Sequence, residues 1–137
     1  MKKMLMLTLS FSLALVILVA CQVNGPGAAV PDEFAGLENP LQGDQAAANA
    51  GMAIYEERCI RCHGENALGQ GPAAENLNPP PTDLVFAANT QNEDYLFWRI
   101  AEGGQGDPIS SSMPSFSAVL DANEIWQVIT YLQQIDE

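Results

Sequence analysis

The clearest pattern of apolar positions lies near the C-terminus. Its members recur at the i, i+3, i+4, i+7 spacing that places side chains along one face of an α-helix. They are Ile125, Val128, Ile129 and Leu132. Asp121 stands before them and Glu124 follows it by three residues, which is the arrangement of a capping box. The pattern predicts a helix that begins after Asp121 and buries its apolar face.

Two further helices are predicted upstream. Asp44 is a good N-cap, and the helix after it is expected to run to about Ile60. Leu96 and Ile100 lie four residues apart in a second segment, from about residue 92 to 102, and a glycine is placed to end it. No run of alternating apolar and polar residues predicts a strand, so the expected fold is all-α.

Glycine and proline dominate the segments between the predicted helices. Residues 22–50 contain four Gly and three Pro before any sustained apolar periodicity. We therefore expect residues 21–43 to form a tether, which Phe34 and Leu37 bring against the domain. Residues 64–82 are also rich in Gly and Pro and are expected to form an irregular but stiff loop.

The first 20 residues have the composition of an export signal. Two lysines are followed by an apolar run from Met4 to Ala20, and small residues precede Cys21. The pattern resembles a bacterial lipoprotein signal, in which the chain is cut before the cysteine and the thiol carries diacylglycerol. It implies a signal peptide at 1–20, lipid on Cys21 and a membrane-anchored domain outside the cytoplasm, on the periplasmic face or the outer cell surface. The alternative is an uncleaved anchor helix, for which this run is at the lower limit of length.

The chain that remains after removal of the signal is strongly acidic. The remaining chain has three Arg, no Lys and 17 Asp plus Glu, a side-chain charge of −14. Such a chain repels nucleic acid and anionic lipid, so the acyl anchor must supply the membrane affinity. A partner protein with a basic docking surface is attracted. The alternative is that the charge only keeps the domain soluble, because the acids are spread along the chain.

Residues 59–63 read Cys-Ile-Arg-Cys-His, the spacing of a c-type haem attachment site. Cys59 and Cys62 are expected to form thioethers with one porphyrin, and His63 to ligate its iron. Cys21 takes the lipid, so no thiol is left free. A zinc site lacks a fourth ligand, a thioredoxin-like pair lacks its βαβ context, and a plain disulfide gives the histidine no role.

The second axial ligand follows largely by elimination. His63 is the only histidine, the exported chain has no lysine, and its N-terminal amine would be acylated. Of the two remaining methionines, Met52 lies two turns before the haem cysteines and is expected to be a packing residue. Met113 lies in a loop stiffened by Pro114 and can cross to the other side of the iron. One covalent haem c with His/Met ligation has no open position, which predicts an electron carrier without a small-molecule substrate rather than an enzyme.

Together these features resemble class I cytochromes c over about residues 48–135. The resemblance rests on Gly51, Tyr55, the Cys59–His63 motif, Met113-Pro114 and a last helix ending in Tyr131-Leu132. It implies a cytochrome c domain at 44–137, with three to five helices around one covalently attached haem. It further implies that Gly51 and Tyr55 meet Val128 and Tyr131 where the first and last helices cross.

The resemblance also implies contacts around the haem. The Nδ1 atom of His63 is expected to donate to the carbonyl of a proline, which is Pro79, Pro80 or Pro81. Trp98 and Arg99 are candidates to meet the haem propionates, although Trp98 is equally suited to the core and Arg99 to the surface.

Such a domain is expected to shuttle single electrons between protein partners. One alternative is a fixed haem subunit of a respiratory quinol-oxidising complex, with residues 22–50 as an interface arm. A haem sensor or peroxidase-like enzyme requires an open distal site, and no acid–base residue near Met113 supports it.

Overall fold

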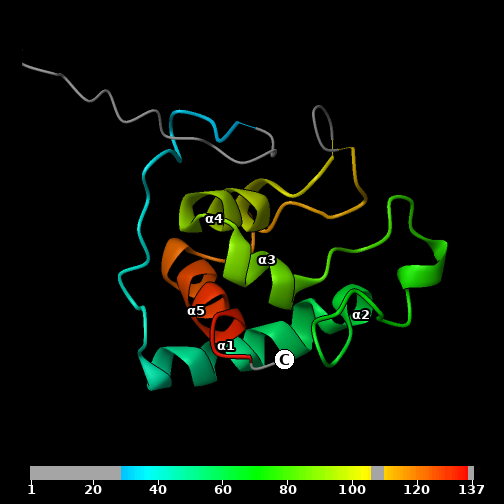
Figure 1. Ribbon diagram of the computed structural model, residues 1–137, viewed down its shortest axis with the longest axis horizontal. Helices are drawn as coiled ribbons and strands as arrows, with labels where there is room; N and C mark the ends of the chain where they lie inside the picture. The colour runs from blue at the N-terminus through cyan, green and yellow to red at the C-terminus, as the bar shows by residue number, and fades with distance from the viewer. Residues whose placement is uncertain (1–28, 106–109, 136–137) are drawn as a thin grey trace, which may run out of the picture.

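The computed structural model describes residues 29–105 and 110–135, and within these ranges every regular element is a helix (Figure 1). The elements are α1 (Gln45–Arg58), α2 (Ile60–His63), the 3-10 turn η1 (Ala74–Asn76), α3 (Leu84–Thr90), α4 (Glu93–Glu102) and α5 (Ala122–Leu132). The all-α prediction is confirmed. The predicted signal peptide and Cys21 lie outside the described residues.

Side-chain caps fix the start of the first and last helices. The Asp44 carboxylate accepts hydrogen bonds from the N–H groups of Ala46 and Ala47, at 2.8 and 3.1 Å. Asp121 and Glu124 form both bonds of the capping box, each 2.9 Å long. Because these bonds satisfy N–H groups that have no partner within the helix, the chain begins each helix where the sequence predicts it.

Helix α3 has no counterpart among the helices predicted from the sequence. Asp83 caps it by accepting a hydrogen bond from the N–H of Phe86 at 2.9 Å. Val85, Ala87 and Ala88 are buried, whereas Phe86 is 61% exposed. The helix has seven residues, which is too short for an apolar period to stand out in the sequence.

Helices α1 and α5 cross at a backbone contact. A Cβ atom on Gly51 would overlap with the carbonyl of Gln127 and lie 2.9 Å from the nitrogen of Val128. Beside this contact, the rings of Tyr55 and Tyr131 pack with their centroids 5.4 Å apart. The predicted crossing of the first and last helices is therefore confirmed.

Helix α5 contributes to both parts of the core. On one side, Phe97 of α4 packs on Trp126 with ring centroids 4.6 Å apart. On the other side, Val128 and Leu132 pack with Tyr55 of α1. In Figure 1, α5 accordingly lies between α4 and α1.

Residues 31–43, here called the N-terminal strap, are folded onto α4 and α5 (cyan in Figure 1). The ring of Phe34 lies 6.2 Å from that of Phe97, as expected, whereas Leu37 is 37% exposed. Asn39 is 8% exposed, and its side chain donates to Thr130 Oγ1 at 3.0 Å. Most of the segment that the sequence analysis treated as a tether therefore packs as part of the domain.

The Asn39→Ala variant is expected to lower the free energy of unfolding by about 1–3 kcal/mol, because it removes buried hydrogen bonds. The lost side-chain bonds are those that Asn39 donates to Thr130 Oγ1 and Gln133 Oε1, at 3.0 and 3.3 Å, and the one that its Oδ1 accepts from the N–H of Leu41, at 2.9 Å. Asn49→Ala is the control, since Asn49 is exposed and bonds only the side chain of Gln45, at 3.2 Å. Urea unfolding measures both variants. Equal stabilities would show that the side-chain bonds of Asn39 do not stabilise the domain.

Candidate haem-attachment site

The three residues of the haem motif lie at the junction of α1 and α2. Cys59 caps the end of α1, and its N–H donates to the carbonyl of Tyr55 at 2.8 Å. The carbonyl of Cys59 then accepts from the N–H groups of Cys62 and His63, at 3.1 and 2.9 Å. Both thiols are free and half-buried. A single turn of backbone thus presents two thiols and one imidazole, the donor set of a covalently attached haem.

Burial affects the chemistry of the first thiol. It raises the pKa of Cys59 to about 11; the charge of Arg58 opposes the shift and Cys62 adds to it. Cys59 is therefore a protonated thiol at neutral pH. Because the thiolate is the reactive form, a thiol with a raised pKa is a poor nucleophile and is oxidised slowly.

The imidazole of His63 is oriented by a carbonyl. Its Nδ1 atom lies 3.1 Å from the carbonyl oxygen of Thr82. Because a carbonyl only accepts, this contact assigns the ring proton to Nδ1 and leaves the lone pair on Nε2 for a metal. Burial lowers the pKa of His63, and the bond to Thr82 partly offsets this. The ring is thus held in the neutral form that binds iron.

The predicted proline partner of His63 is wrong. The accepting carbonyl belongs to Thr82, the residue directly after Pro81. The carbonyl of Pro81 is instead turned toward Gly69, where a Cβ atom would overlap with it. The three prolines restrict the backbone before Thr82, and Thr82 makes the hydrogen bond to His63.

N–H groups of the loop after His63 donate hydrogen bonds to carbonyls of the haem motif. Gly69 donates to the carbonyl of His63, Gly71 to that of Cys62 and Ala73 to that of Arg61, at 2.9, 3.1 and 2.9 Å. A Cβ atom on Gly71 would lie 2.5 Å from the Arg61 carbonyl oxygen, so glycine is needed for this approach. Apart from η1 the loop is irregular, as predicted, and these bonds tie it to the haem motif.

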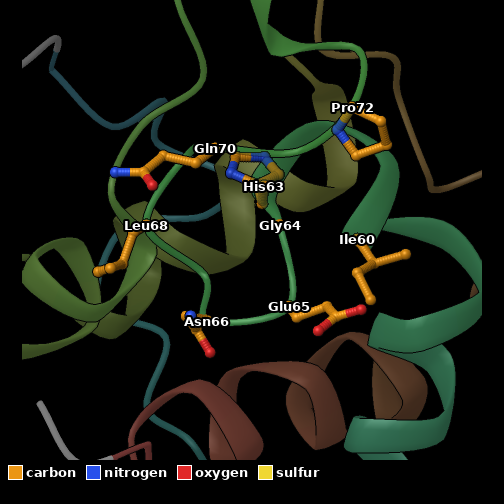
Figure 2. Close-up of a pocket in the computed structure, with 8 residues that line it drawn as sticks. All are labelled: Ile60, His63, Gly64, Glu65, Asn66, Leu68, Gln70 and Pro72. Carbon is orange, nitrogen blue, oxygen red and sulfur yellow. The ribbon is translucent and has the colours of Figure 1, made fainter.

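A pocket of about 430 Å³ opens beside His63. It is lined by Ile60, His63, Gly64, Glu65, Asn66, Leu68, Gln70 and Pro72. Figure 2 shows the loop curving around it, with Ile60 and Leu68 on opposite sides and Glu65 and Asn66 along one edge. Small-molecule sites commonly measure about 300–1,000 Å³, so there is room for a ligand on a face that His63 reaches.

The backbone of Met113 is fixed against the end of α4. Its carbonyl accepts from the N–H of Gly104 at 2.9 Å, and a Cβ atom on Gly103 would lie 2.6 Å from the same oxygen. Phe116 continues the contact by donating to the carbonyl of Ala101 at 3.1 Å. Residues 113–116 are therefore held against the end of α4, while ligation by the Met113 sulfur remains a prediction.

The prediction that Met52 is a packing residue is wrong. Its side chain is 41% exposed on α1. Gly51 and Tyr55 occupy the face of α1 that meets α5, and the residue after Gly51 is turned about 100° away from that face. Position along the helix therefore directs Met52 outward.

Trp98 and Arg99 lie at the C-terminal half of α4. Trp98 is 8% exposed and packs edge-to-face on Tyr95, with ring centroids 5.8 Å apart. The guanidinium of Arg99 lies 5.2 Å from the Trp98 ring centroid, and burial lowers the pKa of Arg99. Trp98 is thus a core residue, and contact of either side chain with haem propionates remains a prediction.

These residues fit a covalently attached haem better than a bare metal ion. Within residues 29–105 and 110–135, no three His, Cys, Asp or Glu side chains gather as a metal site would require. By contrast, the two thiols and the neutral imidazole match the attachment and ligation that a c-type haem needs. Cys59, Cys62 and His63 are the residues that would hold it.

A family model described as "Cytochrome C oxidase, cbb3-type, subunit III" matches residues 46–132. The cbb3-type cytochrome c oxidase subunit CcoP of Azospirillum brasilense is 30% identical over 97 residues, 71% of this chain and 31% of its own length. The cbb3-type cytochrome c oxidase subunit FixPc of Rhizobium leguminosarum bv. viciae is 34% identical over 86 residues, which are 60% of this chain and 28% of its own length. The chain thus spans about a third of the length of these curated relatives.

Solved structures give the same fold. A chain of the Kuenenia stuttgartiensis reducing HAO-like protein complex matches with a TM-score of 0.59 and 26% identity, over 74% of this chain and 48% of that one. Cytochrome CL of Methylophaga aminisulfidivorans matches with a TM-score of 0.52 and 23% identity, over 70% and 59%. The second likeness bears on the fold alone. With its helical fold and the match over residues 46–132, the chain belongs to the c-type cytochrome family described by subunit III of cbb3-type cytochrome c oxidase, and the resemblance to class I cytochromes c is confirmed.

Proposed function

We propose that this chain is a mono-haem c-type cytochrome that transfers single electrons between protein partners. Cys59 and Cys62 attach the haem, and His63 and Met113 are its axial ligands. The observation that carries the proposal is the neutral imidazole of His63, fixed through Nδ1 by Thr82 and adjacent to two free thiols. When bound, the haem supplies a one-electron Fe(III)/Fe(II) couple.

The protein contributes a rigid, partly dry setting for that couple. Thr82 holds the His63 ring, and the loop N–H groups fix the turn that carries both cysteines. Hydrogen bonds between the Met113 segment and the end of α4 restrict movement of that segment. A site that changes little between oxidation states suits electron transfer, and filled axial positions disfavour a peroxidase or a sensor.

The visible spectrum of the mature protein tests this proposal. Expressed with competent haem-attachment machinery, the protein is expected to show low-spin c-type bands in both oxidation states and no rapid CO binding. One chain should carry one haem, because the sequence has one Cys-x-x-Cys-His motif. A colourless protein would overturn the proposal, and a high-spin spectrum would favour the sensor or peroxidase.

A fixed subunit of a respiratory complex is the second candidate. The named relatives are oxidase subunits, and this chain covers about a third of each. The strap is bonded to its own domain through Asn39, so an interface arm formed by residues 31–43 would be a fixed surface of the domain and not a free tether. After gentle detergent extraction a shuttle should migrate alone, whereas a subunit should migrate with other polypeptides.

The proposed membrane attachment rests on the lipoprotein pattern and places the domain outside the cytoplasm. Within the described ranges, no helix is long and apolar enough to cross a membrane. Lipid on Cys21 would then hold the domain through residues 22–30, because the strap begins at residue 31. Mass spectrometry of the haem protein extracted from membranes is expected to show a chain that begins at Cys21 and carries the added mass of a lipid. A chain that begins at Met1 and carries no lipid would favour an uncleaved helix.

The proposed partner has a basic docking surface. With a charge of −14 on the exported chain, attraction should raise the association rate at low ionic strength. Between about 0.01 and 0.5 M salt we expect the rate of electron transfer to such a partner to fall at least about tenfold, as the Debye length shortens from about 30 Å. Stopped-flow kinetics measure the rate. An unchanged rate would mean that the charge serves only solubility.

A further inference from the structure

A single hydroxyl joins the helix crossing to the residue after His63. The side chain of Tyr55 is 1% exposed, and its hydroxyl donates to the carbonyl of Gly64 at 2.7 Å. Gly64 directly follows His63 in the chain. This buried bond connects α1 to the end of the haem motif, nine residues further along the chain.

The contact between α1 and α5 fixes the position of the Tyr55 hydroxyl. Tyr55 lies one turn after Gly51, whose backbone is in contact with Gln127 and Val128 of α5. Its ring packs on Tyr131, with ring centroids 5.4 Å apart. Since α1 has no freedom to slide along α5, the Tyr55 hydroxyl occupies a defined position relative to both helices.

The acceptor of this bond, the carbonyl of Gly64, is connected both to the backbone of His63 and to the segment that binds the His63 ring. The carbonyl of Gly64 also accepts from the N–H of Ala67 at 3.2 Å, so two donors hold one carbonyl. Ala67 is fully buried, and its carbonyl accepts from the N–H of Leu84 at 2.7 Å. Leu84 lies two residues after Thr82, whose carbonyl orients the His63 ring. The Gly64 peptide therefore sits between the backbone of His63 and the segment that holds its side chain.

We propose that Tyr55 is a positioning residue for His63, whose hydroxyl fixes the Gly64 peptide and through it both the backbone of the histidine and the Thr82 carbonyl. The inference rests on the proposed function, since it concerns the imidazole as an axial ligand. The simpler interpretation is that the carbonyl only satisfies a buried hydroxyl. That interpretation predicts lower stability and no change at the histidine.

The test compares Tyr55→Phe with Tyr131→Phe in the haem-loaded full chain. Both variants lose one hydroxyl from the same ring pair, and among the described residues the Tyr131 hydroxyl makes no hydrogen bond. In Tyr55→Phe we expect the amide protons of Ala67 and Leu84 to exchange about tenfold faster, the factor that corresponds to one lost hydrogen bond. The paramagnetic NMR shifts of the His63 ring and the midpoint potential should change as well. Amides within α5 report global unfolding and serve as the reference.

The outcomes separate the inference from the proposed function. Changes at the loop amides and at the His63 ring in Tyr55→Phe, absent in Tyr131→Phe, support the positioning role. If Tyr55→Phe only unfolds more easily, with His63 shifts and potential equal to wild type, the inference is overturned and the cytochrome proposal stands. A wild-type protein without a low-spin haem spectrum would instead overturn the proposed function.

Discussion

Replacing Met113 with alanine is expected to abolish the weak sulfur-to-iron band near ~695 nm in the oxidised haem protein. A thioether stabilises Fe(II) relative to harder ligands, so its loss should lower the midpoint potential and open a position at which CO binds the reduced protein. The fold should survive, because the loop is held through the backbone of Met113 and not through its side chain. Visible spectroscopy and a redox titration measure the effect.

Met52→Ala is the matched control for this experiment. Met52 is the other methionine of the exported chain, and its side chain is 41% exposed on α1. The same substitution there should leave the band, the potential and CO binding unchanged. If Met113→Ala keeps the band, the distal ligand is another group and that part of the proposed site has to be rewritten.

Replacing Gly51 with alanine is expected to lower the free energy of unfolding by about 2–4 kcal/mol. In an exposed helix interior the same change stabilises by about 0.5–1 kcal/mol, since alanine is the better helix former. Here the added methyl would overlap with the backbone of Gln127, which has no rotamer to move away. The sign of the effect is thus opposite to that expected from helix propensity. Urea unfolding of the haem protein, followed by circular dichroism, measures it.

Gly43→Ala is a control for the glycine change itself. Gly43 has a φ of +77° but no atom within 4 Å of its missing Cβ, so alanine should cost only the backbone strain, about 1 kcal/mol. The loss in the free energy of unfolding should be clearly larger for Gly51→Ala than for Gly43→Ala. Equal losses would mean that α1 and α5 can separate at the crossing, and that the contact does not limit what residue 51 can be.

The parts of the fold that were predictable are those specified locally. The caps at Asp44 and Asp121 lie within a few residues of the N–H groups they bind, so their residue types announce the helix starts. The haem motif is likewise a fixed spacing within one turn. The pairing of Gly51 with α5 was also anticipated, but only through resemblance to a known fold.

Other features depended on contacts between distant segments. Helix α3 is too short to produce a visible period, and its cap at Asp83 was not recognised in the proline-rich surroundings. The strap looked like a linker because its Gly and Pro content is high, yet one buried side chain, Asn39, bonds it to α5 across 91 positions of sequence. Composition describes a segment and carries no information about such a partner.

The sequence by itself determined the all-helical class, the capped starts of the first and last helices and the residues available to hold a haem, because each depends on spacing along a chain of fixed geometry. Only the tertiary structure decided that Thr82 orients His63, that Met52 faces outward and that the strap is packed on the domain. Each of these depends on where a backbone carbonyl or a helix face points once distant segments meet. That direction is set by the packing of the whole domain, which no local pattern specifies.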